Sequence, residues 1–188
     1  ESITRPEVKL LCMIMLETAC RPSEARALAK DSLLLNTNIP RLHFNKAVKK
    51  HKKLGGTKTI NGVRKMVISA KLKDKLLDHI NQLPGHQEEL FLNSKAKYIC
   101  VEQIIRGVDK ALAKSGVVVP IKRKSYIFRH YMATYWAYKG KYKNAIDLAH
   151  ALGDSDINFV QRTYIKPYGD NENNVDSSEF QNQQFSWK

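Results

Sequence analysis

Two arginines, one lysine and one tyrosine in this sequence carry side chains that could together cleave a phosphodiester bond without a metal ion. Each guanidinium can fork onto the non-bridging phosphate oxygens, whose negative charge is greatest in the pentavalent transition state. A tyrosine phenolate can attack phosphorus and hold the cut strand covalently. A lysine ammonium can protonate the departing 5′ oxygen if neighbouring arginines lower its pKa. The four residues are Arg21, Lys58, Arg129 and Tyr164.

These residues lie in separate segments whose order and spacing are more informative than any segment alone. An arginine followed three residues later by a glutamate on a helix is usually an ordinary surface pair. A lone tyrosine is more often a half-buried packing residue. In chain order the segments are Glu17-Thr-Ala-Cys-Arg21-Pro-Ser-Glu24-Ala-Arg-Ala-Leu28, the basic stretch that holds Lys58 before Asn61-Gly62, Tyr126-Ile-Phe-Arg129-His130, and Ala151-Leu-Gly153-Asp154 through Tyr164.

Together the four segments resemble the signature boxes of the tyrosine recombinases over about residues 3–166. The resemblance implies that Arg21 and Arg129 are the catalytic arginines and that Lys58 is the catalytic strand lysine. It also implies that Tyr164, which follows a Leu-Gly pair at the spacing of one common branch of the family, is the nucleophile. The implied activity is site-specific DNA recombination or integration through a covalent 3′-phosphotyrosyl intermediate, in a phage or another mobile genetic element. The reaction needs no metal or other cofactor.

Two candidate catalytic positions depart from the family pattern. Tyr126 stands where the family usually has a histidine, although other hydrogen-bonding residues are accepted there. Asp154 stands where the family usually has histidine or tryptophan, and a carboxylate repels a phosphate unless it is protonated or turned away. Asp154 is therefore either a member of the site or only the N-cap of the last helix. His150, one helical turn earlier, can face the same way, whereas His130 is interpreted as structural.

The net charge indicates a polyanionic partner, which the resemblance narrows to double-stranded DNA. Lys and Arg number 32 against 18 Asp and Glu, which gives a formal charge of +14 and a pI near 9.7. Such an excess on a folded domain is typical of nucleic-acid binding. An ordinary solvated loop is the alternative for the most basic stretch. Its candidate DNA contacts are Lys46, Lys49, Lys50, Lys52 and Lys53.

Cysteine usage and hydropathy favour a cytoplasmic protein, in a bacterial host or with its nucleoid. The three cysteines, Cys12, Cys20 and Cys100, give neither a disulfide framework nor the spacing of a metal site. The six histidines are dispersed without zinc-ligand spacing. No apolar run approaches the length of about 20 residues that a transmembrane helix needs.

The elements that must position these residues are mainly helical with a small antiparallel sheet, an α+β arrangement. Asn61-Gly62 between two β-rich runs is a strong hairpin signal. Strands are expected at Arg41–Phe44, Thr57–Ile60, Val63–Ile68 and Glu89–Leu92. Helices are expected from a Thr4 cap through Leu16, and at Arg21–Lys30, Ala70–Leu83, Val101–Ser115, Tyr126–Tyr138, Asn144–Leu152 and Asp154–Tyr164.

Residues 1–167 are interpreted as a catalytic domain and residues 168–188 as a polar C-terminal tail. Because the first residue is Glu1, the separate N-terminal DNA-binding arm that such recombinases carry is expected to be absent. The family cleaves DNA as a tetramer, so we expect a monomer in isolation and a tetramer on DNA. The tail buries too little apolar area to fold alone. Its aromatics, Phe180, Phe185 and Trp187, can dock on a neighbouring protomer; the alternatives are a disordered end or docking on the chain's own domain.

Other classes of function stay open at this point. A DNA-binding relative of the recombinase fold, weakened by Asp154, would bind DNA without forming a covalent adduct. A basic RNA- or ribosome-binding module leaves the order of the four residues unexplained, and no glycine-aromatic RNA motif is visible. A topoisomerase shares the same chemistry but would relax supercoils without pairing two sites.

Overall fold

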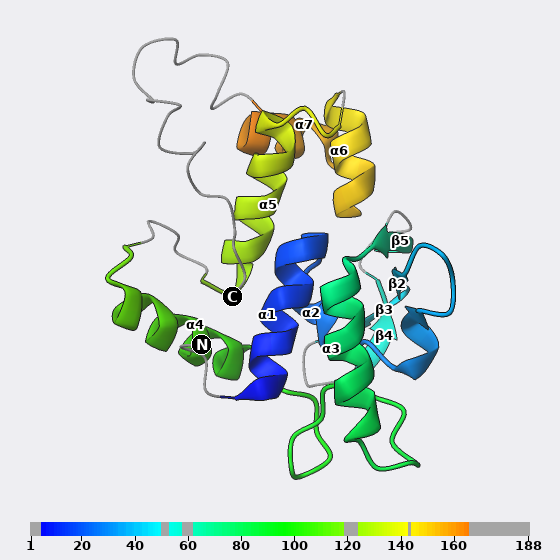
Figure 1. Ribbon diagram of the computed structural model, residues 1–188. Helices are drawn as coiled ribbons and strands as arrows, with labels where there is room; N and C mark the ends of the chain where they lie inside the picture. Colours follow the sequence, from blue (N-terminus) through cyan, green and yellow to red (C-terminus); the bar gives the residue numbers. More distant parts are fainter. Residues whose placement is uncertain (1–4, 50–52, 58–61, 119–123, 143, 166–188) are drawn as a thin grey trace.

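The computed structural model describes residues 5–49, 53–57, 62–118, 124–142 and 144–165. Within these ranges the chain forms helices and two small antiparallel sheets, which confirms the predicted α+β class (Figure 1). Several predictions fall outside the described residues: those for Lys50, Lys52, Lys58 and Asn61, and those for segment 168–188 with Phe180, Phe185 and Trp187.

A buried helix, α1 (Pro6–Thr18), lies at the centre of the described fold, between α4 on one side and α3 with the sheets on the other (Figure 1). It is apolar nearly all round, as expected for a helix surrounded by protein. Proline occupies its first turn, where the missing N–H costs nothing. The cap position belongs to Arg5, which makes no side-chain cap hydrogen bond, and Thr4, the predicted cap, lies outside the described residues.

Three short strands form the first sheet, in the order β1 (Leu33–Leu34), β2 (Arg41–Phe44) and β5 (Arg64–Val67). The predicted strand at Arg41–Phe44 is therefore confirmed. Both pairings are antiparallel, and Leu42 on β2 lies opposite Met66 on β5. Of the strand expected before Asn61-Gly62, only Thr57 is described, and it lies outside the assigned strands.

The lysine-rich stretch contributes a second sheet, which the sequence analysis did not predict. Strands β3 (Lys46–Val48) and β4 (Leu54–Gly56) pair antiparallel, with Ala47 opposite Gly55. The Lys49 N–H donates to the Lys53 carbonyl at 2.8 Å. Gly55 and Gly56 therefore lie in strand β4.

The second predicted helix is much shorter than expected. α2 spans only Pro22–Ala25, not Arg21–Lys30. The chain beyond it is drawn into backbone pairing, since Leu90 N donates to Leu28 O at 3.0 Å and Lys30 N donates to Glu88 O at 2.9 Å. Tertiary pairing here overrides local helix propensity. The strand expected at Glu89–Leu92 is reduced to isolated bridges with Ala29 and Tyr98.

Helices α3 (Ala70–Asn81) and α4 (Val101–Ser115) lie where the sequence predicted them. Ser69 caps α3 by accepting a hydrogen bond from the Leu72 N–H at 3.1 Å. Gly116 ends α4 in the left-handed conformation, with φ 70°, which glycine adopts without steric cost.

The C-terminal part of the described chain packs over one end of α1 (Figure 1). It consists of α5 (Ile127–Tyr138), α6 (Ala145–Leu152), α7 (Ile157–Val160) and a π-helical turn (Gln161–Ile165). Asn144 caps α6 and Gly153 ends it with φ 66°, as the sequence predicted. The last predicted helix starts later than expected and changes to π geometry before Tyr164.

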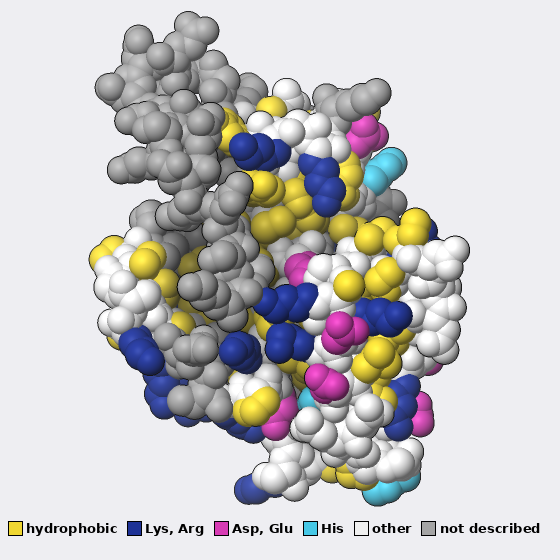
Figure 2. All heavy atoms as spheres, viewed as in Figure 1, with side chains coloured by type: hydrophobic (Ala, Val, Ile, Leu, Met, Phe, Trp, Pro, Cys, Tyr) yellow, Lys and Arg dark blue, Asp and Glu magenta, His cyan; other side chains and the backbone are white. Residues whose placement is uncertain are grey.

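On the face of the molecule that Figure 2 shows, positively and negatively charged side chains are mixed. Figure 2 shows Lys and Arg side chains interspersed with Asp and Glu on the face that carries α1 and α3. The charge excess therefore does not form one uniform basic patch on this face. None of the described helices combines the length and apolarity that crossing a bilayer requires.

Candidate active site

Arg21 and Arg129 converge on the carboxylate of Asp154. Arg21 Nη2 lies 3.2 Å from Asp154 Oδ1, and Arg129 Nη2 lies 2.8 Å from Asp154 Oδ2. The interpretation of Asp154 as only a helix cap is wrong. The cap of α7 is Asp156, whose carboxylate accepts a hydrogen bond from the Phe159 N–H at 2.8 Å.

Arg21 is held in place by Glu24 and by the end of α6. Glu24 Oε2 accepts the Arg21 backbone N–H at 2.8 Å, and Glu24 Oε1 accepts Arg21 Nη1 at 2.9 Å. The same Nη1 also donates to the Gly153 carbonyl at 3.0 Å. Although burial acts to lower it, the pKa of Arg21 is raised because Glu24 and Asp154 stabilise the charged form.

Arg129 is more buried than Arg21, and its guanidinium donates hydrogen bonds to backbone carbonyls. Its Nη1 donates to the Ala19 carbonyl at 2.9 Å and to the Leu152 carbonyl at 2.8 Å. Ala19 ends α1 in a left-handed conformation, with φ 50°. Burial and the like charge of Arg21 lower the pKa of Arg129. Since a guanidinium stays protonated in proteins, both arginines present positive charge at one point.

A third guanidinium, that of Arg64 on β5, completes the cluster and was missed by the sequence analysis. Its Nη2 lies 3.0 Å from Glu24 Oε2, and its Nε donates to the Ala151 carbonyl at 3.0 Å. Burial acts to raise the pKa of Glu24, but the ion pairs with Arg64 and Arg21 lower it. The sequence held one signal for it. Arg64 lies two residues before Met66 on the predicted strand, so both side chains point to the same, core-facing side, where residues are normally apolar.

The five ionised side chains form a chain of alternating charge. Three guanidiniums and two carboxylates leave a net charge of +1. Asp154 and Arg21 are the members of this chain most open to solvent, because their side chains are 21% and 12% exposed while that of Glu24 is 1% exposed. An incoming anion therefore meets these two residues first. In order the chain is Arg64, Glu24, Arg21, Asp154 and Arg129.

Tyr164 lies beside Arg129 and is 2% exposed. Burial raises the pKa of its phenol, while the neighbouring Arg129 side chain opposes that shift. The ring lies between those of His130 and Phe159, with centroids 5.6 Å and 6.3 Å away. Burial and the charge of Arg129 lower the pKa of His130. Tyr164 thus lies beside Arg129, and its raised pKa favours the protonated phenol.

Tyr126, the other unusual candidate, borders the site. It immediately precedes α5 and is half-buried, and its phenol acts electrostatically on the pKa of Arg21. His150, which was considered as a neighbour of Asp154, is exposed on α6.

The described lysines of the basic stretch lie outside this cluster of contacts. Lys46 Nζ makes an ion pair with Asp31 Oδ2 at 2.7 Å, and Lys49 and Lys53 are exposed at the end of the β3–β4 hairpin. Two of these side chains are therefore open to a DNA phosphate, whereas Lys46 already has an acidic partner.

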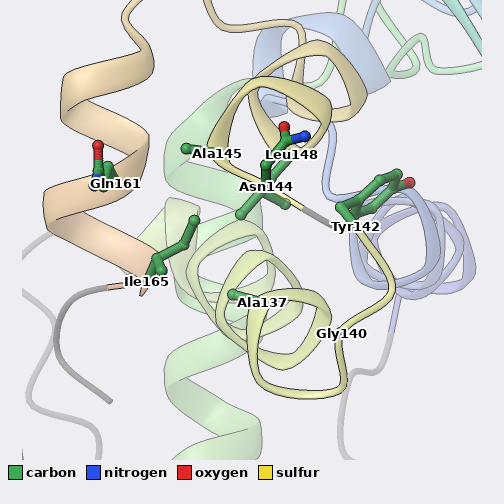
Figure 3. Close-up of a pocket in the computed structure, with 8 residues that line it drawn as sticks. All are labelled: Ala137, Gly140, Tyr142, Asn144, Ala145, Leu148, Gln161 and Ile165. Atoms are coloured by element: carbon green, nitrogen blue, oxygen red, sulfur yellow. The ribbon is translucent and has the colours of Figure 1, made fainter. Parts of the chain in front are cut away.

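A pocket of about 300 Å³ lies beside the segment that carries Tyr164 (Figure 3). Leu148 of α6 lines it together with Gln161 and Ile165 of the π-helical turn. Ile165 directly follows Tyr164, so anything that fills this pocket touches the turn that carries the tyrosine.

Comparisons with known proteins identify the fold. No family model and no curated protein matches the sequence. Among solved structures, the Tn1549 transposon integrase in complex with circular intermediate DNA superposes with a TM-score of 0.69 at 19% identity. That match covers 92% of this chain and 57% of the integrase. The chain therefore has the catalytic-domain fold of the tyrosine recombinases.

Two further structures agree with this identification. The XerH site-specific recombinase bound to difH matches with a TM-score of 0.65 and 19% identity, over 100% of this chain and 49% of that one. The catalytic domain of bacteriophage HP1 integrase matches with a TM-score of 0.55 and 22% identity, over 88% of this chain and 79% of that one. This chain thus spans about half the length of the integrase and of XerH.

Proposed function

We propose that this chain is the catalytic part of a site-specific recombinase or integrase, which cuts and rejoins double-stranded DNA through Tyr164. The observation that carries the proposal is the convergence of Arg21, Arg129 and Tyr164 around a single anionic group. Fold alone does not specify function, but this cluster supplies a nucleophile and a two-arginine anion clamp at one point. A phage or another mobile element in a bacterial cytoplasm is the setting we infer.

In the proposed reaction the two arginines bind the non-bridging oxygens of the scissile phosphate. Tyr164 releases its phenolic proton to solvent as Oη forms a bond to phosphorus, the bond from phosphorus to the 5′ oxygen breaks, and that oxygen takes up a proton. Lys58 is the proposed proton donor, and Tyr126 is proposed to assist at the border of the site. Rejoining reverses these steps, so the energy of the phosphodiester bond is kept in the phosphotyrosyl link.

Asp154 has a defined place in this proposal, because the phosphate must take over its position between the arginines. Its two oxygens contact the two guanidiniums as the two non-bridging oxygens of a phosphate would. A pentavalent transition state carries more negative charge than the net +1 of the resting cluster. Neutralising or turning away Asp154 would raise that charge to +2 and match it better. Gly153 and the partial exposure of Asp154 give the side chain room to turn.

The second candidate, a DNA-binding relative without cleavage, also rests on Asp154. If the carboxylate keeps its two arginines when DNA binds, the scissile phosphate is not clamped and Tyr164 has nothing to attack. DNA would then be held by surface lysines alone. The two candidates differ in one observable, the covalent protein–DNA adduct.

The test is incubation of the protein with a pool of nicked duplexes of randomised sequence, in which cleavage releases a short strand and traps the adduct. We expect an SDS-resistant complex that Tyr164→Phe abolishes without loss of DNA binding. Trypsin cuts after Arg162, and fragmentation of the peptide that begins at Thr163 distinguishes Tyr164 from Tyr168 as the linked residue. DNA binding with no adduct at any sequence would favour the second candidate.

We propose further that the chain is a monomer alone and forms a tetramer on DNA. The pocket beside the nucleophile turn supports coupling between protomers, since an occupant would touch the segment that carries Tyr164. We propose the residues near Phe180–Trp187 of a neighbouring protomer as that occupant. Sedimentation with and without two-site DNA tests the assembly. A tetramer that forms unchanged after deletion of everything beyond Gly169 would exclude a role for the tail.

A further inference from the structure

Three successive carbonyls at the end of α6 each accept a hydrogen bond from a different arginine. Ala151 O is bound by Arg64, Leu152 O by Arg129 and Gly153 O by Arg21, at 3.0, 2.8 and 3.0 Å. The last carbonyls of a helix have no partner within the helix and lie at the negative end of its dipole. The end of α6 is therefore a common anchor for all three guanidiniums.

We propose that Arg64 is a positioning residue that aims Arg21 and Arg129 at the phosphate; this rests on the proposed function. Arg64 occupies the part of the anchor farthest from Asp154, and its side chain is 7% exposed. It also lies over the Phe44 ring, with 5.0 Å from its central carbon to the ring centroid. Each of its three nitrogens already donates to a protein group, Ala151 O, Gly62 O or Glu24 Oε2. Arg64 therefore acts on the reaction through its neighbours and not by touching DNA.

The first route of action runs through Glu24. One oxygen of this carboxylate binds the Arg21 side chain, while the other is shared by the Arg21 backbone N–H and Arg64 Nη2. Arg64 thus fixes the rotation of the carboxylate that holds both the main chain and the side chain of Arg21. Without Arg64, a buried carboxylate with a single cationic partner can rotate toward Arg21 and change the direction of its guanidinium.

The second route runs through the backbone. Arg64 Nη1 donates to the Gly62 carbonyl at 3.0 Å while Nε holds Ala151. One planar group therefore ties the start of β5 to the end of α6, where the carbonyls that hold Arg129 and Arg21 follow directly. Because a guanidinium has donors in a fixed fork, it sets these segments at defined distances, which a lysine ammonium cannot do.

Arg64→Lys tests the proposal because it keeps the positive charge and removes the fork. Arg26→Lys is the matched control: Arg26 is also buried, but it donates to the Ile99 carbonyl and to no member of the charged chain. We expect Arg64→Lys to slow single-turnover cleavage of the nicked duplex about 10- to 100-fold, as loss of an outer-shell partner typically does. DNA affinity should stay within about twofold, since the surface charge is unchanged.

A second readout does not depend on cleavage. In protein labelled with ¹⁵N-arginine, the Nε–H signal of Arg21, identified by its loss in Arg21→Lys, should shift or broaden in Arg64→Lys and stay in place in Arg26→Lys. Glu24→Gln should produce the same change, and the double variant should lose little more than either single one because the residues act as a unit. An Arg21 signal and a cleavage rate that match the Arg26→Lys control would overturn the proposal. If the wild-type protein makes no adduct, the proposed function fails and the Arg21 signal alone decides the role of Arg64.

Discussion

Asp154 Oδ2 accepts a hydrogen bond from Arg129 Nη2 at 2.8 Å, a distance typical of a charge-assisted contact between a guanidinium and an anion. The same carboxylate reaches Arg21 through its other oxygen, so the site contains its own counter-ion. Any substrate phosphate has to compete with a group that is covalently attached and always present.

We expect Asp154→Asn to bind small anions more tightly than the wild type. The amide removes the competing negative charge, and a gain of roughly tenfold in affinity corresponds to about 1.4 kcal/mol. Titration with inorganic vanadate, followed by calorimetry or thermal shift, measures the effect. Asp156→Asn is the control, because this cap residue lies two positions away and asparagine caps helices equally well. Equal vanadate affinity in wild type and Asp154→Asn would show that the carboxylate does not compete.

Arg129→Lys should lose cleavage by about 100-fold or more, the typical cost of removing a transition-state donor. Lysine has a single side-chain nitrogen, so it cannot reproduce the fixed separation between Arg129 Nη1, which binds Ala19 and Leu152, and Nη2, which binds Asp154. Each buried carbonyl left without a donor also costs about 1–3 kcal/mol of stability. Single-turnover rates are therefore compared at a temperature where circular dichroism shows the variant to be folded. A rate within tenfold of wild type under those conditions would contradict the clamp.

Cleavage should become faster as the pH rises above neutral. Burial raises the pKa of Tyr164 above its ordinary value of 10.0, so the phenol is protonated at neutral pH and attack requires loss of that proton. Folding stability, in contrast to the cleavage rate, should fall as the pH rises. The raised pKa stabilises the protonated folded state, and this contribution is lost as the pH rises from about 10 through the folded pKa.

Two measurements check this dependence on pH. A single-turnover profile between pH 6 and pH 9 should rise, and a flat profile would speak against proton loss from the phenol as a limiting event. Alkaline unfolding should be less sensitive to pH in Tyr164→Phe than in the wild type. Tyr142→Phe serves as a comparison, because burial also raises the pKa of this half-buried tyrosine, but it packs against Trp136 and the arginine that acts on its pKa is Arg64 instead of Arg129.

Replacing Lys49 and Lys53 with glutamine should lower the log–log salt dependence of DNA binding by about two, roughly one for each phosphate that a lysine no longer neutralises. Lys46→Gln should lower it less, because Asp31 already offsets that charge. Fluorescence anisotropy across a range of salt concentrations measures the slopes. Lys95→Gln, an exposed lysine in a different loop, is the comparison. Unchanged slopes in the double variant would remove the β3–β4 hairpin from the DNA interface.

Helix ends were predictable from sequence where a single residue determines them locally. Gly116 and Gly153 end α4 and α6 in left-handed conformations that other residues adopt at a cost. The end of α2 was not predictable, because pairing of Leu28 and Lys30 with a distant segment stops the helix. Propensity within residues 21–30 holds no information about that partner.

The residues of the candidate site were likewise predictable only in part. The roles of Arg21, Arg129 and Tyr164 were inferred from residue type and order, and the structure brings all three together. The cap interpretation of Asp154 failed because two carboxylates lie near the start of α7, and only three-dimensional packing decides which of them turns back toward the arginines. Arg64 was missed because its partners Glu24, Phe44 and Ala151 lie on three other elements, far from it in the sequence.

The anchoring of three arginines on the carbonyls of residues 151–153 also affects how this protein can diverge. Every amino acid presents the same carbonyl oxygen, so side chains at these positions can be exchanged without removing a hydrogen-bond partner, provided that Gly153 keeps its left-handed turn. These hydrogen bonds then depend on the path of the backbone, whereas packing still constrains Leu152, which is fully buried. A site built in this way can keep its shape while some of its residue types change.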